Sequence, residues 1–414
     1  MNNTWQIKKL ADICEVFTDG DWIEKKDQSF DGIRLIQTGN IGNSVFKEKG
    51  EKARYISEAT FKKLRCTEIF PDDCLISRLP DPIGRSCIIP HTKEPMITAV
   101  DCTILRFHRQ IILPTWFIYY TLSQEYQTQI NKQISGATRQ RISRHNLGLI
   151  EIPVPNITEQ RHILTILDIV FSTITKAKAH IEKNLLNTWN VFESELQNTF
   201  KNTKNQWQEK TLKQISSSFG RGKSKHRPRN DKKLYGGNYP FIQTGDIRNS
   251  NHYISQYTQT YNEIGLAQSK LWPKGTICIT IAANIAETGI LEFDACFPDS
   301  VIGLVVNPDI AETDFVEYLL QSFKSQLQSK GKGSAQDNIN LATFEHELFP
   351  IPSIPEQHRI VKKLNLLAAK SKKLESIYQQ KLTCLEELKK SILQKAYSGK
   401  LTSANINIDS QVQV

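Results

Sequence analysis

The densest group of basic side chains lies in one loop of the second half of the chain. It contains Arg221, Lys223, Lys225, His226, Arg227 and Arg229. Cationic side chains can neutralise phosphates, and arginine can also donate two hydrogen bonds to guanine. The loop is therefore a candidate for contact with nucleic acid, with a solvated charged loop as the alternative. Gly222-Lys223-Ser224 resembles the end of a phosphate-binding P-loop, but Ser217 stands where that motif needs glycine, which excludes it.

Two further polar segments are candidates for DNA contact, one in each half. The first contains Arg139, Gln140, Arg141 and Arg144. Its counterpart in the second half is rich in amides and includes Gln336 and Asn338. Arginine can read guanine, and asparagine or glutamine can read adenine, through paired hydrogen bonds. Base contact and an ordinary solvated surface both remain open for these residues.

A third set of candidates comes from the tetrapeptide Ile-Gln-Thr-Gly, which occurs once in each half. It offers Gln37, Thr38 and Asn40 in the first half, and Gln243, Thr244 and Asp246 in the second. These side chains could reach DNA. Because the tetrapeptide recurs within a structural repeat, the sequence favours a role in the turn that follows a strand.

The sequence contains no recognisable catalytic motif. It lacks a GxSxG elbow, an HExxH pair and the Asn-Pro-Pro-aromatic tetrapeptide of amino-methylating DNA methyltransferases. Asp72 and Asp73 could suggest a nuclease site, but the matching Lys274-Gly275 has no acid, so a surface turn is favoured. None of the eight cysteines forms a CxxC or has zinc spacing with a histidine. We therefore expect no catalytic residue, no metal site and no cofactor bound by this chain.

The composition of the chain indicates which kind of partner and which cellular compartment to expect. The formal net charge is +10 and the pI is about 9.0, which favours a polyanionic partner such as nucleic acid. The chain has no run of 18 apolar residues and no apolar signal segment at its start. A cytoplasmic protein with reduced thiols and no membrane partner is expected.

The elements that must position these residues are duplicated. One segment begins at Pro153 and another at Pro350, and each continues as a long amphipathic stretch, to Phe200 and Tyr397. Asn156 with Glu159, and Ser353 with Glu356, fit helix capping boxes. The apolar positions expected to face the partner helix are Ile163, Leu167, Ile174, Ile181 and Leu185, and Ile360, Leu364, Leu367, Leu374 and Leu388. At 1.5 Å per residue, such helices are about 60 Å long, which favours a spacer of two packed helices over two ordinary core helices.

The repeat extends over the whole chain and predicts an α+β fold with two mixed domains in tandem. The domains are residues 1–152 and 205–349, the long helices 153–204 and 350–401, and the polar tail 402–414. In the first domain, strands are expected around 33–37, 74–78, 86–90 and 102–107, and helices near 57–66 and 115–133. The segments between the first tryptophan and the IQTG strand differ between the halves. A shared scaffold with divergent loops is typical of two related sites with different targets.

The order of these motifs, with a closing Ala-Tyr-Ser-Gly-Lys-Leu at 396–401, resembles the specificity subunit of a type I restriction–modification enzyme. The resemblance implies two target-recognition domains, each reading half of a split site in double-stranded DNA. It implies that the long helices, as an antiparallel coiled coil, set the gap and dock two methyltransferase subunits, which restriction and translocase subunits then join. S-adenosylmethionine, ATP and Mg would be bound by those partners. The alternatives are a coiled-coil adaptor without DNA contact and a DNA-modifying enzyme with an unrecognised active site.

Overall fold

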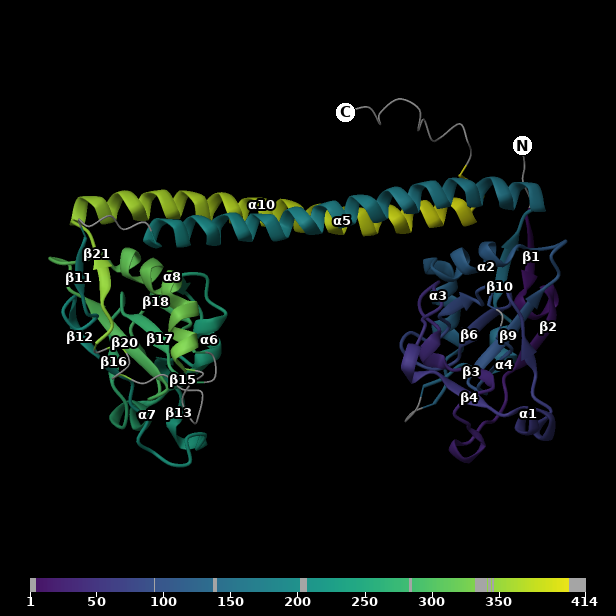
Figure 1. Cartoon of the computed structure of the whole chain (residues 1–414), viewed down its shortest axis with the longest axis horizontal. Helices are drawn as coiled ribbons and strands as arrows, with labels where there is room; N and C mark the ends of the chain where they lie inside the picture. The colour runs from purple at the N-terminus through teal and green to yellow at the C-terminus, as the bar shows by residue number, and fades with distance from the viewer. Residues whose placement is uncertain are drawn as a thin grey trace, which may run out of the picture. The chain divides into compact units, whose positions relative to one another are not determined.

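The computed structural model describes residues 5–92, 94–136, 140–201, 207–282, 285–331, 341, 344 and 346–401. The chain divides into two compact units, one formed by Met1–Ile181 with Gln380–Val414 and the other by Glu182–Gln379. Each long helix, α5 (Ile157–Lys201) and α10 (Ile354–Tyr397), therefore contributes one end to each unit. Figure 1 shows, in each unit, these helix ends beside a body of strands and short helices.

The first unit contains two four-stranded sheets, ordered β2-β9-β6-β7 and β4-β3-β8-β5, and the antiparallel pair β1-β10. All neighbours are antiparallel except β3 and β8. The expected strands are present, and the chain runs through β1 (Gln6–Lys9), β2 (Cys14–Asp19), β3 (Ile33–Ile36), β4 (Arg54–Ile56), β5 (Glu68–Ile69), β6 (Cys74–Ser77), β7 (Ser86–Ile88), β8 (Met96–Thr98), β9 (Cys102–Phe107) and β10 (Glu151–Val154).

The second unit repeats this topology. Its sheets are ordered β12-β20-β17-β18-β14 and β15-β13-β19-β16, and β11 pairs with β21. Apart from the added strand β14, each strand has a counterpart at the same position of the first unit. The strands are β11 (Gln208–Lys210), β12 (Ser216–Arg221), β13 (Tyr235–Phe241), β14 (Tyr253–Ile254), β15 (Gln259–Tyr261), β16 (Leu271–Trp272), β17 (Ile277–Thr280), β18 (Thr288–Leu291), β19 (Ala295–Cys296), β20 (Val301–Val306) and β21 (Phe349–Ile351). The duplication inferred from sequence is thus a duplication of fold.

Short helices pack against these sheets. They are α1 (Glu58–Leu64), α2 (Pro114–Thr121), α3 (Gln124–Gln133), α4 (Arg144–Gly148), α6 (Thr244–Arg248), α7 (Glu263–Ala267) and α8 (Thr313–Gly331). The single helix predicted over 115–133 was wrong, because the segment forms two helices. Ser123 separates them: its hydroxyl accepts a hydrogen bond from the Tyr126 N–H and caps α3.

The glutamine that follows the Pro-x-Pro segment fastens each long helix to its domain. Gln160 is fully buried, accepts from the Leu113 N–H at 2.9 Å and donates to the Ile111 and Pro155 carbonyls. Gln357, also fully buried, does the same with the Glu312 N–H and the Ile310 and Pro352 carbonyls. One amide therefore connects the helix start, the preceding strand end and a loop of the domain. This contact explains why the glutamine occurs in both copies.

We expect Gln357→Ala to destabilise the second unit by about 2–4 kcal/mol, because it leaves buried main-chain groups without their partners. Urea unfolding of the full chain measures the loss. Lys373→Ala, at an exposed position of the same helix within the second unit, is the control. Equal midpoints for the two variants would contradict this role of the buried amide.

Only one of the two expected capping boxes has its side-chain cap. The Asn156 side chain accepts from the Glu159 N–H at 2.9 Å, and the Glu159 carboxylate accepts from the Trp5 indole. At the second helix, the Ser353 carbonyl, not its hydroxyl, accepts from Glu356 and Gln357.

Within each unit the two long helices run antiparallel, but they bury fewer apolar residues than predicted. Lys178 pairs with Glu386 in the first unit, and Lys363 with Glu195 in the second. Ile163, Leu167, Ile174, Ile360 and Leu364 are buried, and Ile181, Leu185 and Leu367 are half-buried. Leu374 and Leu388 are 42% and 47% exposed. A contact between two helices covers a narrow seam, so apolar positions beside it stay exposed.

Candidate nucleic-acid interface

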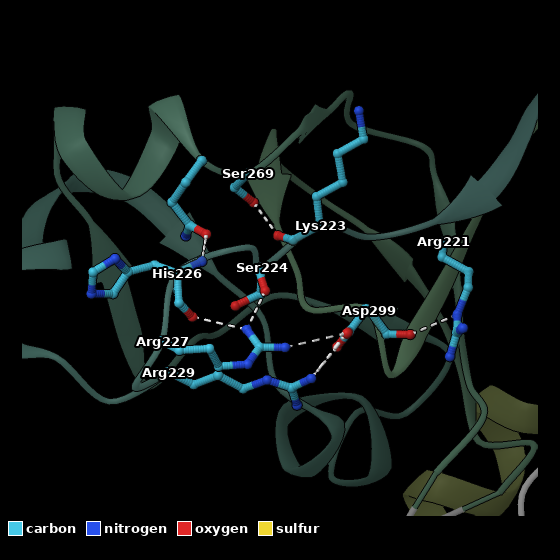
Figure 2. Close-up of polar contacts among 9 residues, drawn as sticks. Arg221, Lys223, Ser224, His226, Arg227, Arg229, Ser269 and Asp299 are labelled. Atoms are coloured by element: carbon cyan, nitrogen blue, oxygen red, sulfur yellow. Dashed lines mark hydrogen bonds and ion pairs between the residues drawn. The ribbon is translucent and has the colours of Figure 1, made fainter.

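Three arginines of the basic loop converge on Asp299 (Figure 2). Arg229 Nη2 lies 2.8 and 2.9 Å from the two carboxylate oxygens of Asp299, and Arg227 Nη2 lies 3.9 Å from one of them. Arg221 Nε donates to the Asp299 main-chain carbonyl at 2.9 Å. The pairing of β12 with β20 explains this meeting, because Arg221 ends one strand and Asp299 precedes the other.

The start of the basic loop passes close to the main chain of Phe297, and Gly222 makes this approach possible. A Cβ on Gly222 would lie 2.3 Å from the Phe297 carbonyl oxygen, and one on Gly20 would lie 2.3 Å from the Thr98 carbonyl oxygen. No side chain fits at such distances. Both divergent loops therefore leave the scaffold at an equivalent glycine.

The other basic residues of the loop are placed differently. Lys223 and Lys225 are exposed, and Figure 2 shows the Lys223 side chain directed away from Asp299. His226 is half-buried, with Nε2 2.9 Å from the Asp231 carboxylate. The loop thus combines arginines held by an acid with two lysines that extend into solvent.

A cavity of about 650 Å³ brings the basic loop together with the IQTG segment of the second unit. Gln243 and Gln259 both line it, and the Gln243 side chain donates to that of Gln259 at 2.6 Å. Asp246 accepts from the Gln243 N–H at 2.8 Å and so caps α6, which supports the turn role for this residue. The remaining polar and aromatic lining includes Ser224, Arg229, Lys232, Tyr235, Phe241 and Thr244.

In the first unit, the IQTG segment also forms a turn. Asn40 is 4% exposed, accepts from the Gln37 N–H at 3.0 Å and donates to the Lys47 carbonyl. The Thr38 carbonyl accepts from the buried guanidinium of Arg85, which also donates to the Ile41, Leu79 and Pro82 carbonyls. Burial lowers the pKa of Arg85, and its four carbonyl partners hold this loop in place. The Asn40 amide is committed to the turn.

The second polar segment of the first unit lies at the surface. Gln140, Arg141 and Arg144 are exposed. The main chain of Arg141 pairs with Ser135, and Arg144 Nη1 lies 3.3 Å from the hydroxyl of Thr18, close to the start of the divergent loop. Arg139, Gln336 and Asn338 lie outside the described residues, as does the tail 402–414.

Several residues of these sites were not identified from the sequence. Trp22 and Phe30, in the divergent loop of the first unit, are 71% and 98% exposed. Aromatic residues in a loop bounded by polar residues were the available signal. No sequence pattern pointed to Asp299 or Gln259. Strand pairing alone brings Asp299 to the basic loop and Gln259 to the IQTG segment. Within the described residues, no cluster of His, Cys, Asp and Glu could hold a metal ion. Among the helices that the structure describes, none has the length and apolar character needed to span a membrane.

The scaffold is duplicated, and the loops that it carries differ between the two units in their basic and polar residues. Residues 2–186 and 204–394 each match the type I restriction modification DNA specificity domain, so the chain belongs to this family. It is a specificity subunit of the type I restriction–modification class.

Named relatives match over most of their length. The putative type I restriction enzyme MjaX specificity subunit of Methanocaldococcus jannaschii is 25% identical, with 96% of this chain and 93% of the relative covered. The StySPI specificity subunit of Salmonella potsdam is 22% identical over 92% and 86%. Among solved structures, the HsdS subunit from Thermoanaerobacter tengcongensis has a TM-score of 0.63, 16% identity and coverage of 97% and 98%. A chain from a structural study of assembly and conformational transition in a type I R-M system has a TM-score of 0.77, 16% identity and coverage of 97% and 99%.

Proposed function

We propose that each domain reads one half of a bipartite site in double-stranded DNA. The observation that carries this proposal is one scaffold built twice, with surface loops that differ beyond an equivalent glycine. In the second unit the contact residues are those of the basic loop and of the cavity beside it. In the first unit they are Gln37 and Thr38 at the IQTG turn, with Gln140, Arg141 and Arg144.

The test is the methylation pattern of a host with and without this gene, read by sequencing that detects modified bases. Loss of a two-part motif, with an unspecified gap between its halves, would support the proposal. A methylation pattern that is the same in both strains would overturn it.

We infer further that the chain is a non-catalytic subunit of a methyltransferase and endonuclease complex in the cytoplasm. Two methyltransferase subunits would dock on the long helices, and restriction and translocase subunits would join that core. S-adenosylmethionine, ATP and Mg would belong to those partners. Exposed apolar side chains on both helices support a docking role, because exposed apolar surface often marks a site of protein interaction. In the second unit they are Leu186, Trp189, Val191, Leu366, Leu374 and Ile377.

We expect Leu374→Asp to reduce co-purification with the methyltransferase subunit at least tenfold, because a charge would replace an apolar contact in the interface. Leu374 is already 42% exposed, so the variant should unfold at the same temperature as the wild type. Ser376→Asp is the control: Ser376 is also exposed and lies about 200° around the helix. Equal co-purification of both variants would place the docking surface elsewhere.

A further inference from the structure

The arginines around Asp299 differ in how many hydrogen bonds they have already formed. Arg227 Nη1 donates to the Ser224 and His226 carbonyls at 2.6 and 2.8 Å, so this side chain braces its own loop. Arg221 uses Nε to hold the Asp299 main chain. Arg229 makes its described side-chain contacts to the Asp299 carboxylate, through Nη2 alone.

Arg229 is fixed at both ends and lines the cavity. The Tyr235 hydroxyl donates to its main-chain carbonyl at 2.7 Å, while Asp299 holds its guanidinium. The remaining guanidinium donors stay available for a ligand. Gln243 and Gln259, the hydrogen-bonded amide pair, line the same cavity. An oriented guanidinium beside amides suits base edges, which present fixed patterns of donors and acceptors.

A surface that only attracts phosphates would gain nothing from a carboxylate at the position of Asp299. An exposed ion pair adds little stability, and this carboxylate is 38% exposed. It also removes positive charge from a loop that would face a polyanion. Since Asp299 adds little stability and weakens phosphate attraction, its remaining effect is to orient the guanidinium of Arg229. Guanine offers two acceptors, O6 and N7, that match a pre-oriented arginine.

We propose that Arg229 reads a guanine in the half-site of the second domain and that Asp299 is its positioning residue. Lys223 and Lys225, which extend into solvent, contact phosphates instead. This assignment rests on the proposed reading of DNA by that domain. It divides the arginines and lysines of the basic loop into one base-reading side chain, two side chains that brace the loop and two that contact phosphates.

The experiment selects duplexes from a randomised library with the full chain in complex with its methyltransferase subunits. Arg229→Lys keeps the charge but loses the planar guanidinium and the Nη1 donors that Asp299 orients, so the preference for guanine should fall about 5- to 150-fold at one position of one half-site. Asp299→Asn should relax the same position to a smaller extent, while binding to random-sequence duplex stays equal or becomes tighter. Lys223→Ala should weaken binding to all sequences alike and reduce the salt slope by about one. All three side chains are at the surface, and thermal unfolding should match the wild type.

Each outcome decides a separate point. If Arg229→Lys weakens all sequences equally, Arg229 contacts phosphate and the proposal is overturned. If Asp299→Asn selects the wild-type motif with unchanged strength at every position, Asp299 does not position the arginine. If the wild-type complex itself selects no motif, the reading of DNA by the second domain fails, and that result is distinct from the failure of Arg229 alone.

Discussion

Replacement of His252 by asparagine is expected to destabilise the second unit by about 3 kcal/mol below pH 6.5. His252 Nε2 lies 2.8 Å from the Asp314 carboxylate, Nδ1 contacts Glu317, and the ring stacks on Tyr318. Glu317 is fully buried and also accepts from Thr288 and Gln321. A ring that faces a carboxylate at each nitrogen must carry both protons. Loss of that cation leaves two acids close together with no positive charge between them.

The same contact predicts how stability depends on pH. Burial alone would lower the pKa of His252, but the carboxylates of Asp314 and Glu317 beside its two ring nitrogens outweigh burial and raise the pKa to about 9. An unfolded histidine has a pKa of about 6.5. Because the folded pKa is the higher one, the contribution is fully present below about pH 6.5 and is lost as pH rises through about 9.

Hydrogen exchange of peptides from β14 and α8 between pH 6 and 9.5, corrected for intrinsic rates, measures this effect. Protection in the wild type should fall with pH, whereas His252→Asn should be about 100-fold less protected at pH 6 and nearly independent of pH. Asparagine tolerates the positive φ of this residue, which is 72°, so backbone strain does not confuse the result. His226→Asn, which loses a single carboxylate partner nearer the surface, is the control. Equal protection of His252→Asn and the wild type at pH 6 would assign the cluster no role in stability.

Patterns that depend on neighbours in sequence predicted the larger features of this fold. The offset between Pro153 and Pro350 identified the duplication, and apolar spacing identified both long helices. Strands around Ile33 and Cys74 were found because short apolar runs are bounded by turn residues. The break between α2 and α3 was harder to find. Ser123 caps α3 only because α2 has already ended at Leu122, and no proline or glycine marks that end in the sequence.

Features that depend on strand pairing were not predictable from the sequence. Asp299 is far from Arg229 in the chain and meets it only because β12 pairs with β20. The basic loop was found as a candidate from its composition, but composition could not distinguish an arginine held by an acid from a free lysine. Likewise, His252 meets Glu317 across the face of β18, and no local spacing links the two residues.

Exchange of the whole first unit for that of a relative with another target should change one half of the recognised motif and leave the other half intact. The exchanged part must include residues 380–414 as well as 1–181, because the first unit contains the end of α10. Tyr397 donates to the Trp116 carbonyl at 2.7 Å and packs against the rings of Trp116 and Tyr120. Leu393 and Ala396 are buried in the same core.

A chimera that takes only residues 1–150 from the relative should therefore fold poorly, because an unmatched α10 end would leave cavities or clashes in that core. The measurement is the methylation motif of each chimera, co-expressed with the methyltransferase subunits, together with its soluble yield. We expect the full-unit chimera to be soluble and to recognise one new half-site, with complete loss of the old one. The second unit keeps its own sheets, basic loop and Asp299 in both chimeras, so its half of the motif should stay the same. A change in both halves would mean that the two domains do not read DNA independently.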